Sequence, residues 1–187
     1  MPAFTDSVVP PGAMSSHPQP TLVVDELTLR PWLPEDAAAL VAAYGDPGVQ
    51  RWHIRSVTEV EAPQWISDAQ ESWTAETAAN WAVIREGTLV GRMKLQTSIF
   101  FGLGLAAYWV VPVARGLGVA PRALGEMTAW GFALGLHRIE LEHSVANDAS
   151  CRVALKAGYA LESTKRSQAL HADGWHDIHL HVRIATD

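Results

Sequence analysis

The run Arg115-Gly116-Leu117-Gly118-Val119-Ala120 carries the clearest chemistry in this chain of 187 residues. It follows an apolar run, 107–112, that is typical of a buried strand, and it precedes a helical pattern over 121–134. Glycines let backbone N–H groups converge on a ligand, and a helix start adds unpaired N–H groups and the positive end of its dipole. The order strand, glycine-rich turn, helix therefore predicts a binding site for a phosphate-bearing ligand.

Two common nucleotide-binding patterns fit this turn poorly. A phosphate loop of the lysine-bearing type needs Gly-Lys-Ser/Thr, and no lysine follows Gly118. A dinucleotide-binding turn needs a third glycine where this chain has Pro121. Glu140 has about the right spacing for the acidic residue of that pattern, but the expected strand order does not match. Both ligand classes are disfavoured, and the turn by itself leaves the ligand open.

Histidines and the single cysteine are the other residues with reactive side chains. His179 and His181 alternate on an expected strand, with His176 nearby. Alternating histidines are typical of a solvated strand face, so no metal ligand is assigned. Cys151 could serve as a nucleophile for a covalent acyl-enzyme, but its spacing to Leu155 favours a buried helix face.

Composition narrows the class of protein. Hydrophobic residues make up 48% of the chain and charged residues 18%, as in ordinary globular domains. The net charge of −6 argues against a nucleic-acid partner. Because there is one cysteine, no intrachain disulfide forms, and the cytoplasm is the expected location. The longest uncharged apolar run, 99–114, is too short for a membrane helix and contains two glycines and a proline.

The elements that must position the turn follow from periodicity. Residues 1–21 hold five prolines and are expected to form a disordered tail, followed by one domain over 22–187. Strands and helices alternate in the middle of the chain and hairpins flank both ends, which predicts a mixed α/β sheet. The expected strands are 27–31, 81–85, 88–95, 107–112, 138–145, 159–167 and 175–184, and the expected helices are 35–44, 58–73 with an interruption at Pro63, 121–134 and 147–158.

Five segments in order resemble a known superfamily. Arg115-x-x-Gly118-x-Ala120 is similar to the Gln/Arg-x-x-Gly-x-Gly/Ala pyrophosphate turn of the GNAT acyl-CoA N-acyltransferases. Segments on both sides resemble its ribosomal-protein N-terminal acetyltransferase (Rim-type) branch, so the resemblance covers about 22–185. These segments are Leu27-Thr28-Leu29-Arg30-Pro31 with Pro34-Glu35-Asp36-Ala37, Asp46-Pro47 with Arg51-Trp52, Tyr108-Trp109-Val110-Val111-Pro112, Asn147-Asp148-Ala149-Ser150 with Lys156-Ala157-Gly158-Tyr159, and Asp173-Gly174-Trp175-His176-Asp177.

The resemblance implies a fold, a cosubstrate and a set of site residues. The fold would be a mostly antiparallel central sheet flanked by helices, whose fourth and fifth strands splay apart to hold acetyl-CoA. Ser150 would protonate the departing thiolate, although a hydroxyl on the helix surface is the alternative. Arg122 would supplement the charge that faces the phosphates, and Asn147 would also cap a helix. The implied acetyl-CoA contacts are Trp109, Val110, Val111, Arg115, Gly116, Leu117, Gly118, Val119, Ala120, Asn147 and Arg152.

The implied reaction is direct transfer of acetyl to an amine in a ternary complex. The acceptor would be a protein N-terminal α-amine or a small amine. Freeing an α-amine with a pKa near 8 costs about 1.4 kcal/mol at pH 7, against about 4.6 kcal/mol for a lysine-like amine. The branch often has a glutamate before its fourth strand, where this chain has Leu105-Ala106-Ala107, so the base stays open among His53, Glu142 and His143.

Other interpretations remain open beside an active acetyltransferase. The missing glutamate allows a catalytically weak or inactive module that binds acyl-CoA as a sensor or interaction partner. Trp52, Trp65, Trp73 and Trp81 would either wall the acceptor site or belong to the core. No membrane partner is expected, and a homodimer is among the assemblies that the resemblance allows.

Overall fold

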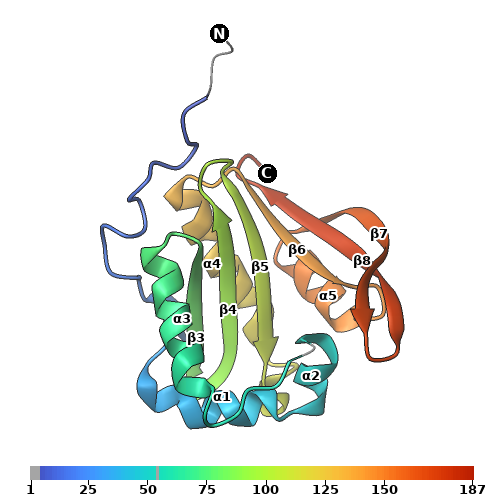
Figure 1. Cartoon of the computed structure of the whole chain (residues 1–187). Coiled ribbons are helices and arrows are strands. Elements are labelled where there is room, and N and C mark those ends of the chain that lie inside the picture. The colour runs from blue at the N-terminus through green and yellow to red at the C-terminus, as the bar shows by residue number, and fades with distance from the viewer. Residues whose placement is uncertain (1–4, 54) are drawn as a thin grey trace.

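One eight-stranded sheet runs through the molecule (Figure 1), whose computed structural model describes residues 5–53 and 55–187. Its strand order is β1-β2-β3-β4-β5-β6-β8-β7, and every neighbouring pair is antiparallel except β5 and β6. This confirms the mixed, mostly antiparallel α/β sheet. The strands are β1 (Leu22–Val24), β2 (Leu27–Pro31), β3 (Ala78–Arg85), β4 (Thr88–Ser98), β5 (Leu103–Val110), β6 (Arg138–Ser144), β7 (Ala160–His171) and β8 (Gly174–Ile184).

Five α-helices are described, and one of them was not predicted. The short helix α2 follows Asp46 directly, in a stretch for which the sequence predicts neither a helix nor a strand. Pro63 lies in the first turn of α3, where a missing N–H costs nothing, so it starts that helix and does not interrupt it. Within the described ranges, none of the helices combines the length and apolar character that a bilayer crossing requires. The helices are α1 (Ala37–Tyr44), α2 (Pro47–His53), α3 (Ala62–Thr74), α4 (Val119–Leu134) and α5 (Asp148–Lys156).

Both faces of the central strands are covered. Six consecutive residues of β3 are buried, so side chains that alternate between the faces enter two separate cores. Trp81 packs into the core that contains Leu124 and Met127 of α4. Ala82 packs into the second core, which contains Trp65 of α3 and Trp109 of β5. The sheet is therefore held rigidly at β5, the strand that precedes the glycine-rich turn.

The prediction of a disordered tail is wrong for the segment that the structure describes, while residues 1–4 lie outside it. Val9 and Met14 are fully buried. The carboxylate of Glu76 accepts hydrogen bonds from the N–H groups of Gly12, Met14 and Ser15 at 2.8, 2.7 and 3.0 Å. Proline-rich composition disfavours regular structure, but two apolar anchors and a carboxylate that binds backbone N–H groups order the segment against the domain.

Candidate active site

The sheet opens between β5 and β6. The two strands pair only from Leu103 with Arg138 to Ala106 with Leu141, although β5 continues to Val110 and β6 to Ser144. Figure 1 shows the two strands diverging below this pairing. The gap lies where the resemblance implies the acetyl-CoA cleft.

Only one of the three residues predicted to offer backbone groups in this gap does so. Val110 and Tyr108 turn their carbonyls into it, where these accept hydrogen bonds from Arg115 Nε at 3.1 Å and His53 Nε2 at 2.9 Å. The N–H and C=O of one strand residue point to the same side, so the Val110 N–H also faces the gap. Val111 donates to the Val90 carbonyl of β4, and Trp109, two residues before it, turns its N–H and C=O to the same side, away from the gap. Both residues therefore differ from the expectation.

The glycine-rich turn has the geometry of an anion cradle. Gly116 and Gly118 adopt φ angles of +80° and +74°, which favour glycine. A Cβ added at Gly116 would meet nothing within 4 Å, so this part of the turn is open. Gly118 is the N-cap of α4 and no side chain caps the helix, which leaves the N–H groups of Val119 and Ala120 for a ligand.

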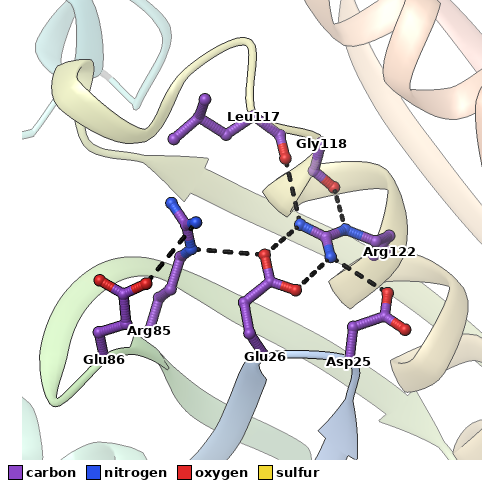
Figure 2. Close-up of polar contacts among 7 residues, drawn as sticks. All are labelled: Asp25, Glu26, Arg85, Glu86, Leu117, Gly118 and Arg122. Atoms are coloured by element: carbon purple, nitrogen blue, oxygen red, sulfur yellow. Dashed lines mark hydrogen bonds and ion pairs between the residues drawn. The ribbon is translucent and has the colours of Figure 1, made fainter.

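Arg122 holds this turn in place (Figure 2). Its guanidinium donates to the carbonyls of Leu117 and Gly118, both at 3.1 Å. It also donates to both oxygens of Glu26, at 2.7 and 2.9 Å, and to Asp25 at 3.1 Å. The Arg122 hydrogen bond lowers the pKa of Glu26 to about 2. Because two carboxylates already neutralise Arg122, the structure gives it a positioning role and not the phosphate contact that the sequence analysis expects.

Arg115 joins three parts of the site. Its guanidinium pairs with Asp46 at 2.7 Å and lowers the pKa of that carboxyl group, while its Nε holds the Val110 carbonyl. Arg115 therefore ties the start of α2 to the end of β5. Arg152 and Lys156 of α5 line the same cavity and form no ion pair among the described residues. Lys156 was not predicted as a site residue, although it lies one helical turn from Arg152 on the same helix.

Helix α5 brings Asn147 and Ser150 to the gap. Asn147 caps the helix, because its side-chain oxygen accepts from the Ser150 N–H at 3.1 Å. This confirms the predicted N-cap, and the side-chain amide of Asn147 has no hydrogen-bond partner within residues 5–53 and 55–187. Ser150 is 8% exposed, so it is not the helix-surface hydroxyl of the alternative interpretation. Its Oγ lies 3.0 Å from the hydroxyl of Tyr108. Burial raises the pKa of Tyr108 to about 12, so this phenol stays protonated at neutral pH.

Of the three candidate bases, His53 is the best placed. Its Nε2 donates to the Tyr108 carbonyl, which leaves the Nδ1 lone pair as the basic position. Burial, and then the charge of Arg92, hold the pKa of His53 below its ordinary value, so the ring is neutral at pH 7. Glu142 is engaged by an ion pair with Lys165. His143 is 7% exposed, and its Nδ1 is used by the carbonyl of Ser144.

Two cavities meet at this constellation. The first, of about 400 Å³, is lined by all the predicted site residues except Val111 and Leu117. The second, of about 320 Å³, extends toward β8 and contains Glu142 and His143. Five residues line both cavities: Trp52, His53, Tyr108, Asn147 and Ser150.

Of the four tryptophans proposed for an acceptor wall, only Trp52 lines these cavities. Trp65, Trp73 and Trp81 are 7%, 7% and 0% exposed, and they belong to the cores.

The expectation of a solvated histidine face on β8 is wrong. His181 is fully buried and His179 is half-buried, because α5 covers this part of the sheet. Cys151, on α5, places its Sγ 3.7 Å from Nε2 of His181. Cys151 is half-buried and Leu155 is 56% exposed, so the expectation that the two share a buried helix face is wrong.

Comparison with known proteins agrees with this geometry. The Acetyltransferase (GNAT) domain family matches residues 26–160. The chain is 28% identical to an uncharacterized N-acetyltransferase, YoaA of Bacillus subtilis (strain 168), over 166 residues that cover 83% of this chain and 90% of the relative.

Solved acetyltransferase structures share the fold. A ribosomal-protein-S5-alanine acetyltransferase from Vibrio fischeri superposes with a TM-score of 0.81 at 20% identity, covering 89% of this chain and 97% of the other. The RimL ribosomal L7/L12 alpha-N-protein acetyltransferase in complex with coenzyme A gives 0.82 at 17% identity, covering 88% and 98%. These matches give no support to the inactive alternative. The chain belongs to the GNAT acetyltransferase family and is an N-acetyltransferase that takes its acetyl group from acetyl-CoA.

Proposed function

We propose that this enzyme acetylates the N-terminal α-amine of a peptide or protein by direct transfer in a ternary complex. The observation that carries the proposal is the meeting of two cavities at Tyr108, Ser150 and His53. A donor in the first cavity and an acceptor in the second would face each other across these side chains. Such an arrangement needs no covalent acyl-enzyme, because both substrates reach one reaction centre.

The donor side fits the pyrophosphate and the pantetheine arm of acetyl-CoA. The turn over 115–120 offers converging N–H groups and the positive end of α4 to the pyrophosphate. Arg152 and Lys156 add positive charge from α5. The amide of Asn147 is a donor for the carbonyl groups of the arm, and the Val110 N–H faces the gap where the thioester would lie.

The chemical step then uses three groups of this chain. His53 accepts the proton of the bound ammonium group at Nδ1, directly or through a water molecule, and the neutral amine attacks the thioester carbonyl. The Val110 N–H stabilises the negative charge that develops on the carbonyl oxygen. As the carbon–sulfur bond breaks, Ser150 gives its proton to the departing thiolate and takes one from the Tyr108 hydroxyl. The attacking nitrogen loses its second proton as the amide forms, and a water molecule carries this proton to the Tyr108 oxygen.

The strength of the base favours an α-amine over a lysine side chain. A neutral histidine with a lowered pKa is a weak base, whereas a lysine-like amine needs about 4.6 kcal/mol for deprotonation at pH 7. Deprotonation of an α-amine at pH 7 costs only about 1.4 kcal/mol, so a weak base is sufficient. The relative acting on ribosomal L7/L12 is named an alpha-N-protein acetyltransferase, which is the acceptor chemistry proposed for this chain.

The acceptor is tested by thiol release from acetyl-CoA with three kinds of amine. These are peptides with a free N-terminus and no lysine, the same peptides N-terminally blocked with one lysine added, and small polyamines or aminoglycosides. We expect turnover with the first group and a mass increase of one acetyl group at the N-terminus. Turnover only with the blocked peptides or the small amines would overturn the α-amine proposal. Coenzyme A binding without turnover on any amine would favour the non-catalytic module instead.

Homodimerisation, a cytoplasmic location and the absence of nucleic-acid and membrane partners stay predictions. Light scattering of the purified chain tests the first of these directly, since a monomeric mass at micromolar concentration would contradict it.

A further inference from the structure

Four potential metal ligands gather beneath α5, away from the glycine-rich turn. They are His143 of β6, Cys151 of α5, and His179 and His181 of β8, and their ligand atoms all lie within 4.8 Å of one another. The acetyl transfer proposed above uses none of these side chains. The cluster therefore needs an explanation of its own.

Strand register and helix position account for the cluster. His143 is paired with His179 in the antiparallel ladder of β6 and β8, and Leu141 is paired with His181. Paired residues share a face and alternate residues return to it, so the three histidines lie on one face. Cys151, in the first turns of α5, approaches that face to within 3.7 Å of His181 Nε2.

The hydrogen bonds around the cluster direct lone pairs into it. His143 Nδ1 donates to the Ser144 carbonyl at 2.8 Å, and His181 Nδ1 donates to the Tyr159 carbonyl at 3.3 Å. Each bond fixes a tautomer whose Nε2 carries a lone pair and no hydrogen. Metal-binding histidines are usually oriented in this way, with the second nitrogen donating to a carbonyl or carboxylate.

Two of the ring nitrogens are buried without a partner. Across the described residues, His143 Nε2 and His179 Nδ1 are among the few buried side-chain nitrogens that have no hydrogen bond. Buried polar atoms without partners cost free energy, so their presence at one point indicates a ligand. His143 and His181 also stack, with ring centroids 5.1 Å apart, an arrangement that protonation of both rings would disfavour.

We infer that His143, Cys151, His179 and His181 bind one zinc ion in a four-coordinate structural site. Three imidazole nitrogens and one thiolate form a donor set that zinc prefers. With Zn–N near 2.0–2.1 Å and Zn–S near 2.3 Å, tetrahedral coordination places nitrogen and sulfur about 3.6 Å apart. Cys151 Sγ and His181 Nε2 lie 3.7 Å apart.

The site has a structural consequence for the enzyme. Four protein ligands leave no open position on the metal, so the ion would take no part in acetyl transfer. It would fasten α5 to β6 and β8. Ser150 precedes the cysteine ligand directly, so the metal would hold the residue that faces Tyr108.

Cobalt(II) titration of the chelator-treated full-length chain tests the inference. We expect one equivalent to bind, with the strong visible bands of tetrahedral cobalt and a thiolate-to-cobalt band in the near ultraviolet, and zinc to displace it. Cys151 is the only cysteine of the chain, so the thiolate band reports on this site alone. Cys151→Ser should abolish that band and weaken zinc binding by more than about 100-fold.

A matched control separates the site from general histidine binding. His137 is exposed and lies outside the cluster, so His137→Gln should keep both the spectrum and the affinity. His179→Gln, tested beside it and checked for folding by circular dichroism, should lose the tetrahedral bands. Absence of stoichiometric cobalt or zinc binding by the folded wild-type chain would overturn the inference. Equal metal affinity in the wild type and in folded Cys151→Ser would overturn it as well.

Discussion

The hydroxyl of Tyr108 on β5 lies 3.0 Å from the Oγ of Ser150 on α5. This hydrogen bond spans the point at which β5 and β6 part, and both residues line both cavities. The resemblance assigns a role to the hydroxyl of Ser150, whereas no role was predicted for the side chain of Tyr108. The hydrogen bond couples the two groups. In the proposed reaction, the two residues therefore deliver the proton to the leaving thiolate together.

Removing either hydroxyl should slow turnover without weakening acetyl-CoA binding. We expect Ser150→Ala to lower kcat by about 100-fold, the usual contribution of a general acid. Tyr108→Phe should lower it by about tenfold, roughly the cost of one hydrogen bond. The double variant should be no slower than Ser150→Ala, because the two groups act in series. Steady-state thiol release measures all three, with exposed Ser163→Ala as a control, and an unaltered kcat in Ser150→Ala would contradict the assignment.

The glycine-rich turn should tolerate no side chain at Gly118. A residue with a Cβ at φ +74° costs about 1–2 kcal/mol, so the turn in Gly118→Ala should shift and displace its N–H groups. We expect coenzyme A affinity, measured by calorimetry, to fall about tenfold or more. Gly87 has a φ of +76° with open space around it, in the turn between β3 and β4. Gly87→Ala therefore imposes a similar strain away from the cavity, and it should lower stability while leaving affinity unchanged.

The loss of kcat/KM at low pH should report the protonation of His53. Burial holds the pKa of this imidazole below 6.5, so the ring is neutral above that value and loses its basic lone pair as the pH falls through its lowered pKa. With an α-amine that binds as the ammonium group, kcat/KM should fall again above about pH 8, because the free amine has no proton to give to His53. His53→Gln should lower the plateau by about 100-fold and remove the acidic inflection. A full acidic inflection in that variant would assign the titration to another group.

The N-terminal segment should contribute to the stability of the domain. Met14 is fully buried, and truncating a buried methionine typically costs about 2–5 kcal/mol. We expect Met14→Ala to lower the free energy of unfolding in urea by that amount. Val60 is 90% exposed, and Val60→Ala should change it by less than about 0.5 kcal/mol. Equal stability of the two variants would contradict the packing of Met14 and support a disordered N-terminal segment.

Much of the donor side was predictable because it is local. The turn over 115–120 is one contiguous run whose geometry depends on two glycine φ angles and on the helix that follows. The N-cap of α5 by Asn147 is equally local, since a cap spans three residues. Alternating hydrophobicity also predicted most of the strands. Interactions over such short separations leave their signal in residue type and spacing.

Contacts between distant elements were decided by the tertiary structure. The orientation of β5 gives the cleft-facing N–H to Val110 and not to Trp109 or Val111, because residues of a strand alternate in direction. The sequence predicts Arg122 as a phosphate ligand, but its guanidinium pairs with Glu26, which lies 96 residues away in the chain.

The histidines of β8 show the same division. Their alternation in the sequence is equally compatible with a solvated face and with a buried one. Pairing of β8 with β6, and the placement of α5 above them, bring Cys151 to His181 and leave His143 Nε2 without a partner. The sequence alone determined the family, the cosubstrate and the anion turn, because these depend on short contiguous motifs. Only the fold decided which side chains meet across the gap and beneath α5, because strand register and helix packing bring together residues that lie far apart in the chain.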